Sequence, residues 1–154
     1  MRIATKNGSG GGIGKGKGKK GEKEKERGRR GDVGLDDLVY RVIGCMIQVH
    51  KELGPGFVEG PYHRAVEIEL GSQGIHFESE KKITLHYRGK VIGTHELDLF
   101  VEKELAVELK AVEELHPKHY AQVRSYLKAV GKPLGLLVNS AACPVDCRRV
   151  ERDA

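Results

Sequence analysis

Residues 97–110 read LDLFVEKELAVELK, and this stretch decides the fold. Apolar residues alternate with charged or small ones on both sides of the polar triplet 102–104, which is typical of two strands joined by a tight turn. With a three-residue loop, positions 98 and 108 each lie five residues from position 103 and therefore pair. We expect Asp98 and Glu108 to stand opposite each other, with Cβ atoms roughly 4.5–5.5 Å apart.

The charged residues of this hairpin share one face. Glu108 and Lys110 are two apart on one strand, so both point to the same side as Asp98. The apolar residues that alternate with them are expected to form the core face: Leu97, Leu99, Val107 and Leu109. The pattern leaves two interpretations open. The charged face is either a solvated surface with a salt bridge, or a site where a divalent cation offsets the repulsion between two carboxylates. Hard oxygen ligands suit Mg²⁺ or Mn²⁺.

The sequence around the hairpin predicts further helices and strands. Apolar residues at spacings of three and four indicate amphipathic helices, and two-residue alternation indicates strands. The helices are expected at residues 36–53, 59–70 and 117–130, and the other strands at residues 83–88, 134–138 and 147–150. The order of these elements predicts an α+β fold, a mixed α/β plan with one central sheet flanked by helices.

Charge divides the chain into two parts. The chain has 27 Lys and Arg residues and 22 Asp and Glu residues. Residues 1–34 contain 11 of the basic residues and four of the acidic ones, so this part carries a net charge of +7, and residues 35–154 carry −2. The first part also holds 11 of the 21 glycines. We therefore predict a disordered, Gly/Lys-rich basic tail over residues 1–34 and one folded domain over residues 35–154. The tail is either an arm that binds phosphates or a solvated extension.

Several classes of protein are not indicated. The sequence has no apolar run of 18 residues and no apolar segment of a secretory signal at the start, so we expect an intracellular, cytoplasmic protein with no membrane partner. The three cysteines form no disulfide framework, and Cys45 is expected to be a small helical residue without a catalytic role. His116 and His119 lack the companions of a zinc site, and no nucleotide-binding loop or serine nucleophile motif occurs.

Four short motifs, in order, resemble those of a nuclease family. Asp98 followed by residues 108–110 (ELK) resembles the PD-(D/E)xK nuclease core in its E-x-K form. Residues 56–62 (GFVEGPY) match the motif that names the GxxExxY family, a branch of that superfamily, and residues 48–56 (QVHKELGPG) look like its opening helix and loop. Residues 122–126 (QVRSY) resemble the Q-x-x-x-Y motif of RecB-type nucleases. Together the motifs span about residues 35–140.

The resemblance implies a fold and a chemistry. The fold would be the restriction-endonuclease-like αβββαβ core, and the activity a nuclease that hydrolyses DNA with Mg²⁺ or Mn²⁺. Asp98 and Glu108 would hold the cation together with the backbone carbonyl of Leu109. Lys110 would position the attacking water, and cation and lysine together would offset the charge of the transition state. Glu59 would complete the acidic cluster, although it also suits the first turn of its own helix.

Three further residues are candidates for contact with the substrate. Gln122 and Tyr126 are four apart on one helix face, so the resemblance implies that they line the site or hold nucleic acid, with Gln122 also counted among the catalytic residues. Part of the Tyr126 ring could instead pack in the core, as we expect for Tyr62. The family pattern has an Arg where Thr94-His95-Glu96 stands. Either His95 replaces this Arg, or Glu96 crowds the site.

This departure from the pattern leaves a second function open. The domain could be a catalytically weak or inactive nuclease fold that serves as a module for binding nucleic acid or protein. A homo-oligomer is compatible with either function, and the sequence identifies no interface.

Overall fold

The computed structural model describes residues 20–153, with side chains from residue 34 onward. The chain divides into two units after Val33, and the description below concerns the second. Helix α1 (Lys20–Leu53) begins well before residue 36, where the apolar periodicity starts. Residues 1–19 of the predicted tail lie outside the described residues, so the division into tail and domain stays a prediction.

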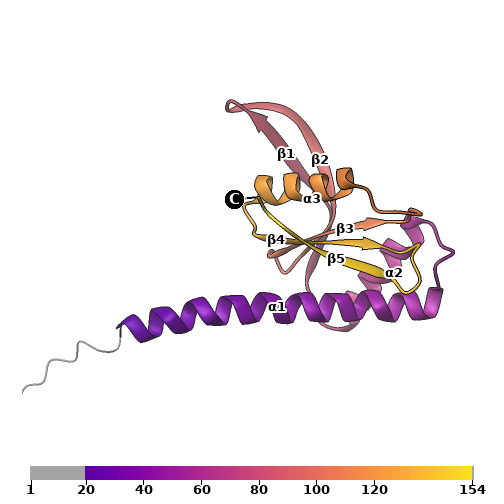
Figure 1. Cartoon of the computed structure of the whole chain (residues 1–154), viewed down its shortest axis with the longest axis horizontal. Helices are drawn as coiled ribbons and strands as arrows, with labels where there is room; N and C mark the ends of the chain where they lie inside the picture. Colours follow the sequence, from indigo (N-terminus) through magenta and orange to yellow (C-terminus); the bar gives the residue numbers. More distant parts are fainter. Residues whose placement is uncertain (1–19, 154) are drawn as a thin grey trace, which may run out of the picture. The chain divides into compact units, whose positions relative to one another are not determined.

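The second unit is built on one mixed sheet of five strands (Figure 1). The strands lie side by side in the order of the chain, and every neighbouring pair is antiparallel except β3 and β4, which are parallel. Their bounds are β1 (Phe77–Tyr87), β2 (Lys90–Val101), β3 (Leu105–Lys110), β4 (Leu134–Asn139) and β5 (Asp146–Glu151). The predicted α+β fold with a central mixed sheet is confirmed.

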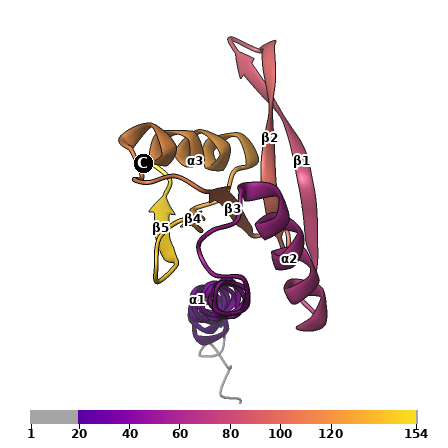
Figure 2. The ribbon, with the colours of Figure 1, turned by 90° about the vertical axis from the view of Figure 1, so that its right-hand side faces the viewer.

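Helices cover both faces of this sheet (Figure 2). Residues 38–49 of α1 and the buried face of α2 (Glu59–Ser72) pack on one face, in a core that includes Leu99, Val107, Leu109 and Leu136. Helix α3 (Pro117–Val130) packs on the other face, in a second core that includes Phe100, Ala106 and Leu137. The sheet is therefore the middle layer of three.

Helix α3 also makes the crossover between the parallel strands β3 and β4. It begins with Pro117, whose fixed φ suits a first helical position, and ends at Gly131, whose φ of 69° is left-handed. Gly135 lets the helix approach β4, because a Cβ there would lie 2.8 Å from Cγ1 of Val123. The predicted bounds of this helix, 117–130, match the structure.

Helix α3 covers part of the charged face of the hairpin: Glu108 is only 4% exposed, whereas Asp98 and Lys110 are partly exposed. One expectation about the hairpin needs correction. Leu97 does not share a core with Leu99, because it packs on the α3 side. The pairing of β1 with β2 skips Glu80 and Asp98, and Glu80 has a φ of 52°. This irregularity reverses the alternation of side chains between Leu97 and Leu99.

No helix in residues 20–153 is long and apolar enough to span a bilayer.

Candidate functional site

The candidate site begins where β2 and β3 separate. Their ladder pairs Leu99 with Val107, and the same register places Asp98 opposite Glu108, as the loop length predicts. The ladder does not continue to this pair. Instead, an Asp98 carboxylate oxygen (Oδ2) accepts a hydrogen bond from the backbone N–H of Leu109 at 2.7 Å. The Asp98 carboxylate thus lies against the β3 backbone at the opening between the strands.

The Leu109 carbonyl faces the same opening. Successive carbonyls of a strand point to opposite sides, and the N–H and C=O of one residue point to the same side. The Leu109 N–H points to Asp98, whereas the carbonyl of Lys110 points toward β4, where it accepts from the N–H of Ser140 at 2.8 Å. The Leu109 carbonyl therefore points toward Asp98 and away from β4.

Glu108 is a buried carboxylate with an unused oxygen. Its Oε2 is buried and finds no hydrogen-bond partner among the described residues. The Lys110 Nζ lies 3.6 Å from Glu108 Oε1. Burial, and next the nearby Asp98 charge, raise the pKa of Glu108 to about 8, while the Lys110 charge works against them. An isolated carboxylate in this position is costly to ionise, and a cation beside it would remove that cost.

Glu59 is the candidate acidic residue from helix α2. It is the first residue of α2, and the N-cap Val58 makes no side-chain capping bond. Burial and then the Asp98 charge raise the pKa of Glu59, whereas Lys110 and His63 oppose the rise. The predicted acidic residues thus act on one another electrostatically, although Glu59 itself is solvent-exposed.

Helix α3 closes the site from above the sheet. Tyr126 is 2% exposed, and burial, followed by the charges of Glu108 and Asp98, raises its pKa to about 12. Gln122, one turn earlier on α3, works against this rise and therefore lies near the Tyr126 hydroxyl. The ring of His95 stacks edge-on against Tyr126, with centroids 5.5 Å apart. The Tyr126 ring therefore packs in the α3-side core and lies near the carboxylates, and its contact with a substrate stays a prediction.

Tyr62, the last residue of the GFVEGPY stretch, lies outside this cluster. It is 1% exposed, and its hydroxyl donates to the carbonyl of Met46 at 3.1 Å, so it ties α2 to α1. Its expected place in the core is confirmed.

The residues present suit a hard divalent cation in part. The carboxylates of Asp98 and Glu108, the second with an unused oxygen, and the Leu109 carbonyl supply the oxygen ligands that Mg²⁺ or Mn²⁺ prefers. However, within residues 20–153 no three His, Cys, Asp or Glu side chains gather as closely as a full metal-binding group. A cation here would therefore take its side-chain ligands from Asp98 and Glu108 and a further oxygen from the backbone, with Glu59 at greater reach.

Asn139 is a supporting residue that sequence reasoning missed. It ends β4 and is 2% exposed. Its side chain donates to the Val112 carbonyl at 2.8 Å and accepts from the Val112 N–H at 3.1 Å. These bonds hold the segment that follows Lys110. The available signal was a polar residue after a buried strand, because the carboxyl ends of neighbouring parallel strands meet at one edge of a sheet.

His63 is a second missed residue. It lies one turn after Glu59 on α2, where its Nε2 is 3.1 Å from the Ser79 hydroxyl and 3.2 Å from a Glu67 carboxylate oxygen. Its charge opposes the raised pKa of Glu59, so it belongs to the electrostatic surroundings of the site. A histidine four residues after the motif glutamate was the signal for it.

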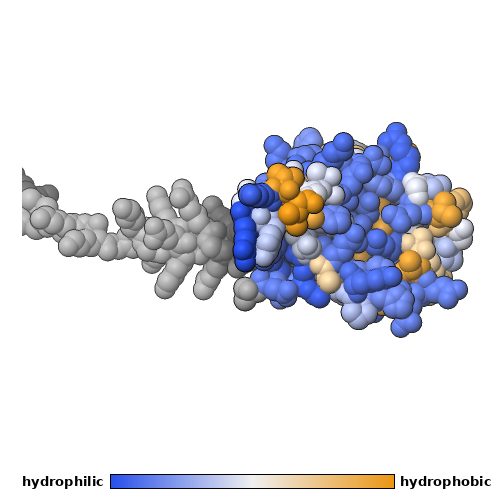
Figure 3. Space-filling model, turned by 90° about the horizontal axis from the view of Figure 1, so that it is seen from above, coloured by the Kyte–Doolittle hydropathy of each residue, from blue (hydrophilic) through white to orange (hydrophobic). Residues whose placement is uncertain are grey.

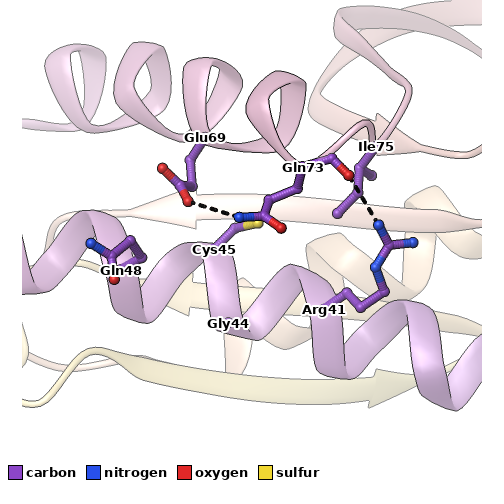
Figure 4. A pocket seen from close by; sticks show the side chains of 7 residues that line it. All are labelled: Arg41, Gly44, Cys45, Gln48, Glu69, Gln73 and Ile75. Carbon is purple, nitrogen blue, oxygen red and sulfur yellow. Dashed lines mark hydrogen bonds between the residues drawn. The ribbon is translucent and has the colours of Figure 1, made fainter.

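A separate pocket lies between α1 and α2 and contains none of these residues. Its volume is about 390 Å³, and its lining includes Arg41, Cys45, Glu69 and Gln73. In Figure 4, the Gln73 side chain reaches Glu69, and the Arg41 guanidinium donates to the Gln73 backbone carbonyl at 3.1 Å. Its polar groups are thus engaged with one another. Burial raises the pKa of the Cys45 thiol, as expected for an unreactive core cysteine.

Comparisons with known proteins place this geometry in a family. No curated protein matches the sequence. Solved structures similar to it include SSO0001, with 21% identity and a TM-score of 0.48, and the alkaline exonuclease LHK-Exo from Laribacter hongkongensis, with 17% identity and a TM-score of 0.45. Each match covers 60% of this chain and about half of the other, 48% and 54% respectively. The family model of the PD-(D/E)XK nuclease superfamily matches residues 36–150, and the chain therefore belongs to this superfamily.

Proposed function

We propose that the protein is a metal-dependent nuclease of the GxxExxY branch, with the Q-x-x-x-Y motif of RecB-type nucleases, and that it hydrolyses phosphodiester bonds of DNA. The observation that carries this proposal is the Asp98–Glu108 pair, in which Glu108 is buried, has an unused oxygen and lies beside Lys110. Strongly perturbed titratable groups gathered at one strand opening are typical of catalytic sites.

The cation would be held by the carboxylates of Asp98 and Glu108 and by the Leu109 carbonyl, with Glu59 joining through a water. Mg²⁺ or Mn²⁺ bound there would lower the pKa of an attacking water and offset charge on the phosphate oxygens.

The chain's own residues would do the rest. The Lys110 ammonium lies 3.6 Å from Glu108, so it would hold the attacking water and stabilise its deprotonated form. The attacking water would release a proton to solvent, and its oxygen would bond to phosphorus while the bond from phosphorus to the leaving sugar oxygen breaks. That sugar oxygen would take up a proton from solvent water. Gln122 and Tyr126 would orient the phosphate from α3, and His95 would supply the polar contact that an Arg makes in the family pattern.

A cleavage assay tests the proposal. Linear and closed circular DNA are incubated with Mg²⁺ or Mn²⁺ and with wild type, Asp98→Ala, Lys110→Ala or Glu96→Gln. Glu96 is the matched control, because it is an exposed acid two residues from Asp98 on the same strand. We expect the first two variants to lose about 100-fold or more of the wild-type rate and the control to keep it. Cleavage that neither Asp98→Ala nor Lys110→Ala reduces would exclude this site.

A second candidate function is a binding module without catalysis. Two observations favour it: the residue expected to be Arg is absent around His95, and Glu59 does not join the carboxylate pair as a direct third ligand. In that case wild type would not cleave DNA, Glu108→Ala would bind it unchanged, and a divalent cation would not raise the melting temperature.

We further propose that residues 35–154 are the nuclease domain, that the basic tail of residues 1–34 is dispensable for cleavage, and that the protein acts on nucleic acid in the cytoplasm. The tail is tested by deleting residues 1–34. Unchanged cleavage and an unchanged salt dependence of DNA binding would agree with the proposal, whereas a flatter salt dependence would show that the tail contacts phosphates.

A further inference from the structure

The β1–β2 hairpin extends beyond the body of the domain as a two-stranded ribbon (Figures 1 and 2). Its far part, residues 81–95, is called the arm below. Pairing between β2 and β3 begins only at Leu99, so the β2 half of the arm pairs with β1 alone. Near the base of the arm, Ile83 is 5% exposed and packs in the α3-side core, whereas residues 86–92 are exposed. A two-stranded ribbon gains little stability by itself, which makes this exposed part an unusual feature.

The arm concentrates positive charge. Residues 35–154 contain 16 basic residues (Lys and Arg) and 18 acidic residues (Asp and Glu). The arm contains four of these basic residues and none of the acidic ones. The arm therefore carries +4, whereas the remainder of that range carries −6. The four basic residues are Lys81, Lys82, Arg88 and Lys90. A ribbon with this charge on an acidic domain attracts a polyanion.

The tip of the arm is also apolar. Tyr87, Val91 and Ile92 are 60%, 63% and 65% exposed. Most of the face shown in Figure 3 is hydrophilic, with hydrophobic residues in a few separate patches. Arg88 lies over the Tyr87 ring at 5.3 Å, so cationic and apolar groups share the tip. Such a mixture suits a nucleic-acid groove, where basic side chains meet phosphates and apolar ones meet sugars and base edges.

The arm leads directly into the candidate site. Strand β2 runs from Lys90 to Asp98, and the eight steps between these residues span about 26 Å at roughly 3.3 Å each. At its base, His95 contacts Tyr126 of the site. Consider a DNA duplex with one phosphate at Asp98 and its axis along the arm. With a rise of about 3.4 Å per base pair, the tip of the arm would contact this duplex roughly eight base pairs from that phosphate.

We propose that the arm is a second nucleic-acid contact, which binds the duplex flanking the phosphate to be cleaved. Arg88 and Lys90 bind its phosphates, and the side chains of Tyr87, Val91 and Ile92 enter a groove. This inference rests on the proposed function, because it takes DNA to be the substrate. A second copy of this chain fits the arm less well, since two arms of +4 would repel each other.

The test is binding of fluorescently labelled DNA duplexes of about 12 and 30 base pairs, measured by anisotropy in EDTA over a range of salt concentrations. The arm variant is Arg88→Ala with Lys90→Ala. The control is Lys51→Ala with Lys128→Ala, which makes the same charge change at exposed positions outside the arm. We expect wild type to bind the longer duplex more tightly. The arm variant should lose most of this preference, and its salt slope should fall by roughly 0.9 per lost phosphate contact, or about two in all. The control should resemble wild type.

A second variant probes the apolar tip. Val91→Ser with Ile92→Ser should weaken binding of the longer duplex several-fold with the salt slope unchanged, because no charge is removed. Binding by both arm variants equal to wild type would overturn the proposal, as would an equal loss in the control. Light scattering that shows a wild-type dimer and a monomeric arm variant would assign the arm to self-association instead.

Cleavage separates this proposal from the one on which it rests. If wild type binds through the arm but never cleaves, the arm contact stands and the nuclease proposal fails. If wild type cleaves and the arm variants bind and cleave as it does, the nuclease proposal stands and the arm contact fails.

Discussion

The Asp98 carboxylate accepts a hydrogen bond from the Leu109 N–H across the gap where β2 and β3 part. The Asp98 side chain thus replaces the next backbone hydrogen bond between the two strands. The strands can therefore separate without leaving the Leu109 N–H unpaired. The same geometry turns the Leu109 carbonyl toward Asp98. One contact therefore ends the pairing of two strands and assembles two of the proposed cation ligands.

Asp98→Ala should lower stability as well as activity. The Leu109 N–H would lose its acceptor in a buried setting, which costs about 1–3 kcal/mol. Urea unfolding measures the change. Glu96→Gln on the same strand is the control and should stay within about 0.5 kcal/mol of wild type. Equal stability of Asp98→Ala and wild type would show that water satisfies the amide.

The free energy of unfolding of the metal-free protein should fall as the pH rises toward the raised pKa of Glu108. The raised folded-state pKa of about 8, against an ordinary value of 4.5, means that the folded protein keeps a proton that the unfolded chain has released. This contribution is fully present below about pH 4.5 and is lost as pH rises through about 8. Urea unfolding in EDTA from pH 5 to about 9 should show the fall. Glu108→Gln, which stays neutral, should flatten it, and identical pH profiles would contradict the assignment.

A divalent cation should reverse that loss. At a pH near 8 the cation displaces the Glu108 proton and binds only the folded state, so it raises the melting temperature as its concentration exceeds its dissociation constant. Thermal unfolding with millimolar Mg²⁺ or Mn²⁺ measures this rise. Asp98→Ala and Glu108→Gln should lose it. Equal stabilisation of all three proteins would place the cation elsewhere.

Gly135→Ala should be destabilising because α3 lies close to β4. The new Cβ would lie 2.8 Å from Val123 Cγ1 and 3.2 Å from the Ala106 carbonyl oxygen, so the helix must shift at a cost of about 1–3 kcal/mol. Gly44→Ala is the control, since a Cβ there meets nothing within 4 Å and an alanine favours the helix by up to about 1 kcal/mol. Denaturant unfolding of the two variants should therefore move in opposite directions.

Local patterns predicted most of the elements. Helix α3 and strand β3 begin and end where periodicity and turn residues place them, and the loop length alone set Asp98 opposite Glu108. Strand β1 begins at Phe77, several residues before the predicted start. The prediction began too late because residues 77–82 (FESEKK) show no apolar alternation. That part becomes a strand through pairing with β2.

The sequence by itself determined the order of the elements, the register of the β2–β3 hairpin and the superfamily motifs, because these depend on residues near one another in the chain. Only the tertiary structure decided that α3 buries Glu108, that the Glu108 carboxylate is costly to ionise, and that Asn139 holds the segment after Lys110. It also decided that the arm extends beyond the sheet. Burial and electrostatic cost depend on which distant segments meet, and that is settled by packing and not by local periodicity.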